Sequence, residues 1–209
     1  MGSTLDPFNP LWVSRIPHVS FGAQIEVNIE GDWEEYGRQI LADFDGVSGL
    51  NEEVKILHAC AGHALYCAEL LEFDLHIIVH FVHKLTGEAT KPEHHDAIDQ
   101  ELSGKPLGAV LVKVKELLTL DEVSLQLLDD GRVARNQLCH GFYGRNANDM
   151  YSRAGRRRMV ESLIGITRTI REGSMVSTGM SKALMQMAGV TEEYLQKWLE
   201  EFRASVGAD

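Results

Sequence analysis

The stretch from Arg132 to Tyr143 gathers two arginines, an amide, an imidazole and a phenol within about three helical turns. If this stretch is helical, Asn136 and His140 lie four residues apart on one face. Arg135 then lies about 140° around the helix from His140, because each residue advances the helical wheel by about 100°. That separation suits two groups that hold one ligand between them. An arginine that binds a phosphate beside a histidine that moves a proton is the minimum equipment for cleaving a phosphodiester.

The sequence around this polar group predicts an amphipathic helix. A capping box, Thr119-Leu120-Asp121-Glu122, begins the predicted helix, which runs to about Phe142. Its apolar residues fall in one arc of the helical wheel, opposite the polar group. This arc contains Val123, Leu127, Ala134, Leu138 and Phe142. We therefore expect the helix to pack through its apolar arc and to present the polar group on its other side.

The string Arg135-Asn136-Gln137-Leu138-Cys139-His140 resembles the signature of HEPN domains. In that signature His follows Arg after four to six residues, and Asn very often comes directly after Arg. The resemblance covers residues 51–172. It implies an all-α fold, a HEPN-like helical bundle of four to five core helices.

The resemblance also implies roles for individual residues. Arg135, Asn136 and His140 would be catalytic, with Arg132 and Tyr143 in support. In HEPN-like proteins the first core helix commonly carries an acidic residue near the motif. The candidates here are Glu69 and Glu72, and their spacing does not choose between them.

The activity that the resemblance implies is cleavage of RNA without a metal or cofactor, at a site shared across a homodimer. The 2′-OH of the RNA would attack, leaving a 2′,3′-cyclic phosphate and a 5′-OH. His140 would move the proton, Arg135 would hold the phosphate as charge builds on it, and Asn136 would orient one of them. Such a protein would be a toxin or defence effector, and many relatives work beside a nucleotidyltransferase or an antitoxin.

Arginine is concentrated between Gly131 and Arg171, where nine arginines accompany only two acidic residues. The planar guanidinium group matches the geometry of phosphate. The residues that we expect to bind RNA are Arg145, Arg153, Arg156, Arg157 and Arg158. The net charge of −11 for the whole chain argues against a general nucleic-acid binder, and we expect no DNA binding. The alternative is a solvated basic loop that binds nothing.

A long helix is predicted from Asn51 to about Thr86, with Gly87 after it. Its apolar residues recur every three or four positions along its whole length. This seam consists of Val54, Leu57, Ala61, Ala64, Ala68, Leu71, Leu75, Ile78, Val82 and Leu85. The seam must pack along another long helix, either in this chain or in a second copy.

Five histidines on the same predicted helix raise the alternative of a metal site. They are His58, His63, His76, His80 and His83. Imidazoles at such spacing can bind zinc or nickel, and the pattern resembles the metal-binding bundles of the DinB-like family. The last three lie off the seam, however, whereas a metal site in a bundle needs ligands that point inward from several helices. We therefore expect a solvated polar face and no metal.

The remaining segments divide the chain into three parts. Residues 1–50 form an N-terminal extension, with a possible strand at 25–30 and a short helix that ends near Gly46. Residues 51–172 form the helical domain, with a loop at 88–105, a short helix at 106–118, a polar lid loop at 145–154 and a helix from Gly155. Residues 173–209 form the third part, a C-terminal helical hairpin packed on the domain; a linker at 172–178 leads into it, and its helices are expected at 182–187 and 191–203. The second helix of this hairpin is too acidic to read DNA.

Composition places the chain among globular proteins, with 44% hydrophobic and 24% charged residues. No apolar run reaches the roughly 18 residues of a membrane span, and no leader is evident, so we expect a cytoplasmic protein without membrane contact. The long seam and the acidic surface also fit a second function. In that alternative the protein is a non-catalytic HEPN-like module that binds a protein partner or a nucleotide.

Overall fold

The computed structural model describes residues 20–21, 33–89, 91–191, 193–197 and 200 of the chain. Nearly all of these residues are helical, which confirms the predicted all-α fold. The helices are α1 (Trp33–Gly46), α2 (Leu50–Leu85), α3 (Pro92–Leu102), α4 (Leu107–Leu117), α5 (Glu122–Cys139), α6 (Phe142–Arg145), the 3₁₀ helix η2 (Ala147–Tyr151) and α7 (Arg153–Met187). Two short strands, β1 (Ser20–Phe21) and β2 (Thr119–Leu120), form one parallel pair.

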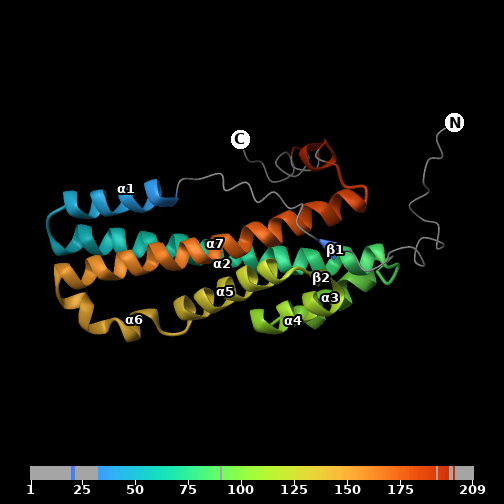
Figure 1. The fold of residues 1–209 in the computed structure, drawn as a ribbon, viewed down its shortest axis with the longest axis horizontal. Helices are drawn as coiled ribbons and strands as arrows, with labels where there is room; N and C mark the ends of the chain where they lie inside the picture. Colours follow the sequence, from blue (N-terminus) through green and yellow to red (C-terminus); the bar gives the residue numbers. More distant parts are fainter. Residues whose placement is uncertain (1–19, 22–32, 90, 192, 198–199, 201–209) are drawn as a thin grey trace.

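The long helices α2 and α7 lie side by side and form the axis of the fold (Figure 1). α5 packs mainly on α7, α1 packs on both long helices, and α4 covers the C-terminal half of α2. The predicted seam of α2 is buried against α7 of the same chain, with Leu57, Leu71 and Ile78 fully buried. Full burial of such a side chain contributes about 1.5–3 kcal/mol. Because α7 covers the seam, the seam by itself does not require a second subunit.

Two glycines let α5 and α7 approach closely. A Cβ at Gly173 would lie 2.9 Å from the backbone oxygen of Leu127 and 3.4 Å from Cα of Gly131. A Cβ at Gly131 would lie 3.2 Å from Cδ2 of Leu71. Glycine within a helix costs about 1 kcal/mol relative to alanine, and this close crossing explains why it is used in both helices. The crossing fixes α5, the motif helix that carries Arg135 and Asn136, against the long helices α2 and α7.

Two carboxylates of α2 bind side chains of α7 inside the protein. Glu53 is only 2% exposed and accepts hydrogen bonds from Arg153 and Arg156. Asp74 accepts hydrogen bonds from the hydroxyl groups of Ser177 and Thr178. Burial raises the pKa of Asp74, although both hydroxyl groups act in the opposite direction. These contacts fix how the two long helices lie along each other.

Several predicted boundaries were wrong. The linker predicted at 172–178 does not exist, because α7 continues without a break to Met187, so the predicted boundary at residue 172 falls inside a helix. Gly173, Ser174 and Ser177 are buried there, and packing outweighs their weak helix propensity. The segment predicted as a loop at 88–105 contains α3. The predicted strand at 25–30 lies outside the described residues.

The motif helix is shorter than predicted at both ends. Its N-cap is Asp121, whose side chain accepts a hydrogen bond from the backbone N–H of Ser124, and its last residue is Cys139. Val123, predicted to be in the apolar arc, is exposed, whereas Ala134 and Phe142 are buried as expected. The lid loop predicted at 145–154 consists largely of η2, with the last residue of α6 before it and the first turn of α7 after it. Residues 193–197 are helical, as predicted for the second helix of the hairpin, whereas residues 182–187, predicted as its first helix, are the end of α7.

Candidate active site

Arg135 projects from α5 toward α2 and is held there by a carboxylate. Its Nη2 atom lies 3.0 Å from Oε2 of Glu72, and its Nη1 atom lies 3.4 Å from Oδ1 of Asn136. The side chains of Arg135 and Glu72 are 20% and 27% exposed, so the pair lies at the surface and is partly screened by water. Glu72 is therefore the acidic residue beside the motif. Glu69 is exposed, and no hydrogen bond or ion pair joins it to the described part of the chain.

His140 is the C-cap of α5 and not a residue of its polar face. Its backbone N–H donates to the carbonyl of Asn136 at 3.0 Å, and its side chain is exposed. Among the described residues, none forms a hydrogen bond, ion pair or ring contact with its imidazole. Gly141 follows with a φ of 109°, a left-handed conformation that ends the helix. The predicted angle of about 140° on the wheel therefore does not describe where His140 lies.

Arg145 closes the end of the motif helix. It donates one hydrogen bond to the backbone oxygen of His140 at 3.1 Å and another to the backbone oxygen of Gln137. A cation at a helix C-terminus satisfies free carbonyls and complements the helix dipole. Sequence reasoning assigned Arg145 to RNA and missed this role. The sequence signal for this capping role is Gly141, a residue type common at helix C-termini, followed four residues later by Arg145.

Tyr143 lies on α6 and forms an edge-to-face contact with His58 of α2, with ring centroids 5.9 Å apart. Burial raises the pKa of the Tyr143 phenol. The pairs Arg135–Glu72 and Tyr143–His58 show that α5 and α6 run antiparallel to α2. His58 and Glu72 are about 21 Å apart along α2. The candidate residues thus extend along one side of α2 from Glu72 to His58, and sequence reasoning did not place His58 among them.

Arg132 occupies the turn before Arg135 but binds within its own helix. Its Nε atom lies 3.0 Å from Oδ1 of Asp129, and the hydrogen bond lowers the pKa of that carboxyl. Its side chain also lies beside Gly108 of α4. Arg132 therefore contributes to the packing of α5 on α4 as well as to the surface near the motif.

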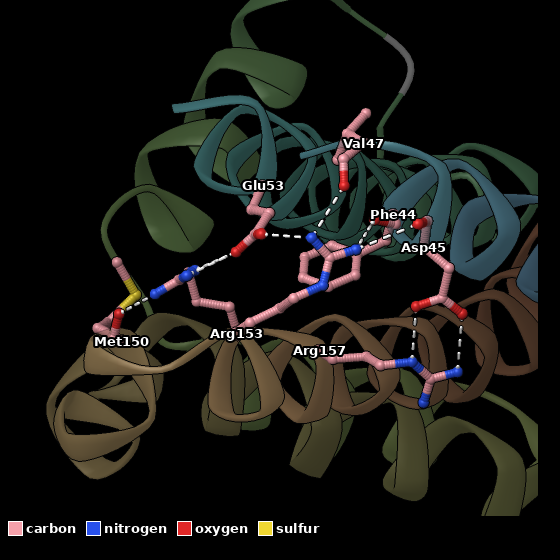
Figure 2. Close-up of polar contacts among 8 residues, drawn as sticks. Phe44, Asp45, Val47, Glu53, Met150, Arg153 and Arg157 are labelled. Atoms are coloured by element: carbon pink, nitrogen blue, oxygen red, sulfur yellow. Dashed lines mark hydrogen bonds and ion pairs between the residues drawn. The ribbon is translucent and has the colours of Figure 1, made fainter. Parts of the chain in front are cut away.

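The arginines at the start of α7 bind their own chain (Figure 2). Arg156 is only 7% exposed, and its Nε and Nη2 atoms donate to Oε2 of Glu53 at 2.8 and 2.5 Å. Arg153 donates to Oε1 of Glu53 and to the backbone oxygens of Phe44, Asp45 and Val47. The guanidinium group of Arg156 is therefore not on the surface, where an RNA could contact it.

The next two arginines are paired at the surface. Arg157 bridges Asp45 and Glu161, and Arg158 pairs with Asp149. Surface pairs of this kind are weak and exchange with other anions readily. Of the five arginines predicted to bind RNA, Arg158 has the most exposed side chain among those in ion pairs, at 60%.

The histidine face of α2 is not solvated as predicted, because α3 folds over it. The side chain of His80 is 19% exposed and that of His83 is 13% exposed. His80 contacts His95 and Asp99, while His83 pairs with Glu88. Within the described part of the chain, no group of three or more His, Cys, Asp or Glu side chains is arranged to hold a metal ion.

A hollow of about 310 Å³ lies between α1 and α2, away from the motif. Its polar feature is a hydrogen bond of 2.5 Å between the Tyr36 phenol and Nδ1 of His63. Burial raises the pKa of Tyr36 to about 12 and that of the adjacent Cys60 to about 11, so both groups stay neutral. The rest of the described wall is apolar apart from Asp43, and no arginine is among the described residues that line it.

Large apolar side chains are exposed on α2 beside the motif. Leu65, Tyr66 and Phe73 are each more than two-fifths exposed, and they flank the turn that carries Glu69 and Glu72. Exposed apolar patches on proteins often mark interaction sites, so these three side chains are candidates for one. None of the described helices is both long enough and apolar enough to cross a membrane.

Comparisons with protein-family models, with curated proteins and with solved structures found no match to this chain.

Proposed function

We propose that the protein is a metal-independent endoribonuclease of the HEPN type that acts as a toxin or defence effector. The observation that supports this most is the geometry around Arg135. Glu72 and Asn136 hold its guanidinium group at the surface of α5, about one and a half turns before the exposed imidazole of His140, for which the described residues supply no side-chain partner. An oriented cation and a titratable group at one helix end are what the cleavage of a phosphodiester needs.

The proposed reaction begins when the RNA 2′-oxygen attacks the adjacent phosphorus atom. Its proton passes to a base, the P–O5′ bond breaks, and the leaving 5′-oxygen receives a proton. His140 accepts or donates one of these protons. Arg135 binds the phosphate as negative charge builds on it, and because a guanidinium has five N–H donors it can keep Glu72 at the same time. Asn136 keeps the guanidinium in place.

The proposal includes a homodimer, because in an in-line displacement the attacking 2′-oxygen and the leaving 5′-oxygen lie on opposite sides of the phosphorus atom, so one imidazole does not reach both. His140 of a second copy would supply the other proton transfer. Since α7 covers the seam of α2 within the chain, the dimer must use another surface. We propose the exposed side chains of Leu65, Tyr66 and Phe73, which lie on the same helix as Glu72. Packing this face would bring two motif helices close to one another.

The second candidate is a non-catalytic module that binds a protein partner, such as an antitoxin or a nucleotidyltransferase. The observation that favours it is that arginines predicted to bind RNA are paired with carboxylates of their own chain. Arg153 and Arg156 are engaged by Glu53, and the chain carries a net charge of −11. In that case the exposed apolar residues of α2 would contact the partner.

Single-turnover cleavage of a short RNA in EDTA, with binding measured separately, tests the proposal. His140→Ala is expected to lower the rate by about 10² to 10⁴ with little change in Kd. Arg135→Lys is also expected to fail, because an ammonium cannot reproduce the planar fork. Gln137→Ala, an exposed change on the same turn of α5, is the matched control and should keep the wild-type rate. Folded His140→Ala and Arg135→Lys variants that cleave at the wild-type rate would overturn the proposal.

A further inference from the structure

The contact between α2 and α3 brings together two histidines that are 15 residues apart in the sequence. Nδ1 of His80 lies 3.2 Å from Nδ1 of His95, and the ring centroids are 5.5 Å apart with planes inclined by 26°. The two nitrogens therefore lie within hydrogen-bonding distance of one another. A shared proton satisfies this arrangement, and so could a cation that both lone pairs reach.

A third residue orients this pair. Oδ1 of Asp99 lies 2.8 Å from Nε2 of His80. A carboxylate at that position selects the tautomer with the proton on Nε2, which leaves a lone pair on Nδ1 directed at His95. The same carboxylate–imidazole arrangement holds and activates histidine ligands in many metal sites. Asp99 comes from α3, as His95 does, so one helix delivers both the second ligand and the orienting group.

We propose that Nδ1 of His80 and Nδ1 of His95 bind one divalent transition-metal ion of the zinc, nickel or copper type, with water completing the coordination. A tetrahedral ion with Zn–N bonds of 2.0–2.1 Å needs the two nitrogens about 3.3 Å apart. The observed separation of 3.2 Å is close to this value. The ion can thus replace the shared proton after a small rotation of the two rings.

The chemistry of the donors selects the class of ion. Imidazole nitrogens suit zinc, nickel and copper, whereas magnesium and calcium require oxygen ligands. Burial lowers the pKa of His95, and the charges of His80 and Lys84 lower it further, which favours the neutral imidazole that a metal requires. Lys84 also opposes a cation, and Asp99 offsets it. With two protein ligands the affinity will be well below that of a structural zinc site.

Binding would fasten α3 to α2 by a bond that the apoprotein lacks. This metal binding does not depend on the proposed ribonuclease activity. His80 lies beyond Glu72 on α2, on the side away from His58, and His95 lies on α3. His83, one turn further along the same face of α2, contacts Glu88 and does not join the pair in this structure.

The test is calorimetric titration of the full chain with ZnCl2 and NiCl2, with MgCl2 as the negative control. We expect one saturable ion per chain for zinc and nickel and no binding of magnesium. His95→Gln should abolish that binding, and Asp99→Asn, which keeps both ligands, should weaken it by about 10- to 100-fold. His58→Gln, a change of an exposed histidine elsewhere on α2, should leave it unchanged.

Thermal melts give a second readout, because an ion that binds only the folded state raises Tm. Zinc should raise Tm for the wild-type chain and for His58→Gln, but not for His95→Gln. Absence of saturable binding by the wild type would overturn the proposal. So would equal affinity in the wild type, His95→Gln and Asp99→Asn, because the ion would then be bound by other histidines of the chain.

Discussion

The change Arg156→Ala tests whether the arginines of α7 are structural. In the wild type, the guanidinium group of Arg156 donates two hydrogen bonds to Glu53, which is 2% exposed, and one to the backbone oxygen of Met150. Removal of one partner of a buried ion pair costs about 3–5 kcal/mol, because the other charge stays buried. Arg153, which lies 2.8 Å from Glu53 in the wild type, remains as a partner for this carboxylate, so we expect a loss near the lower end, about 3 kcal/mol.

Urea denaturation measures this loss directly. The midpoint should fall while the slope m stays constant, since the surface exposed on unfolding hardly changes. Arg158→Ala is the matched control, because Arg158 is exposed and pairs only with Asp149, and its loss should be at most about 1 kcal/mol. If Arg156→Ala lost less than Arg158→Ala and instead weakened RNA binding, the assignment of Arg156 to the interior would be refuted.

Three further outcomes are expected. Gly173→Ala should destabilise the protein by about 1–3 kcal/mol in urea, because its Cβ would meet the backbone of α5, whereas Gly165→Ala on the same helix has open space and should be neutral or stabilising. Because burial raises the pKa of Asp74 above 3.8, the contribution of its carboxyl group to wild-type stability should fall as pH rises from 3.8 through that pKa. Asp74→Asn should therefore unfold at higher urea than the wild type at pH 7, and the gain should vanish below pH 3.8; a gain equal at both pH values would contradict the shift. Sedimentation should give the mass of a dimer at micromolar concentration, and Phe73→Glu should give a monomer; a monomeric wild type would exclude the shared site.

Periodicity was sufficient to predict the longest helix of the fold. Apolar residues at every third or fourth position located α2 to within about one residue at each end, and the buried side of α2 is the predicted seam. The same pattern could not say which helix covers the seam. That answer depends on α7, in which residues 172–178, with Gly173, Ser174 and Ser177, were predicted as a linker although they lie inside the helix. Those small residues are buried in the contact with α2 and α5, so tertiary packing determined their conformation.

The candidate site was predictable in its residues more than in its geometry. The motif string located Arg135 and Asn136 on one helix, and the structure selects Glu72 over Glu69 as the neighbouring carboxylate. A helical wheel does not show where a helix ends, so it put His140 on the polar face of α5, whereas His140 is the C-cap of that helix. Charge counting likewise treated Arg156 as a surface cation, because the carboxylate that buries it lies 103 residues earlier in the chain.

The chemical identity of the RNA fragment ends tests the central claim most directly. Purified protein would be incubated with a defined RNA in EDTA, and the fragments would be analysed by mass spectrometry. We predict 2′,3′-cyclic phosphate and 5′-hydroxyl ends from the wild-type chain, and intact RNA from folded His140→Ala. Fragments with 3′-hydroxyl and 5′-phosphate ends, or cleavage by His140→Ala at the wild-type rate, would contradict the account.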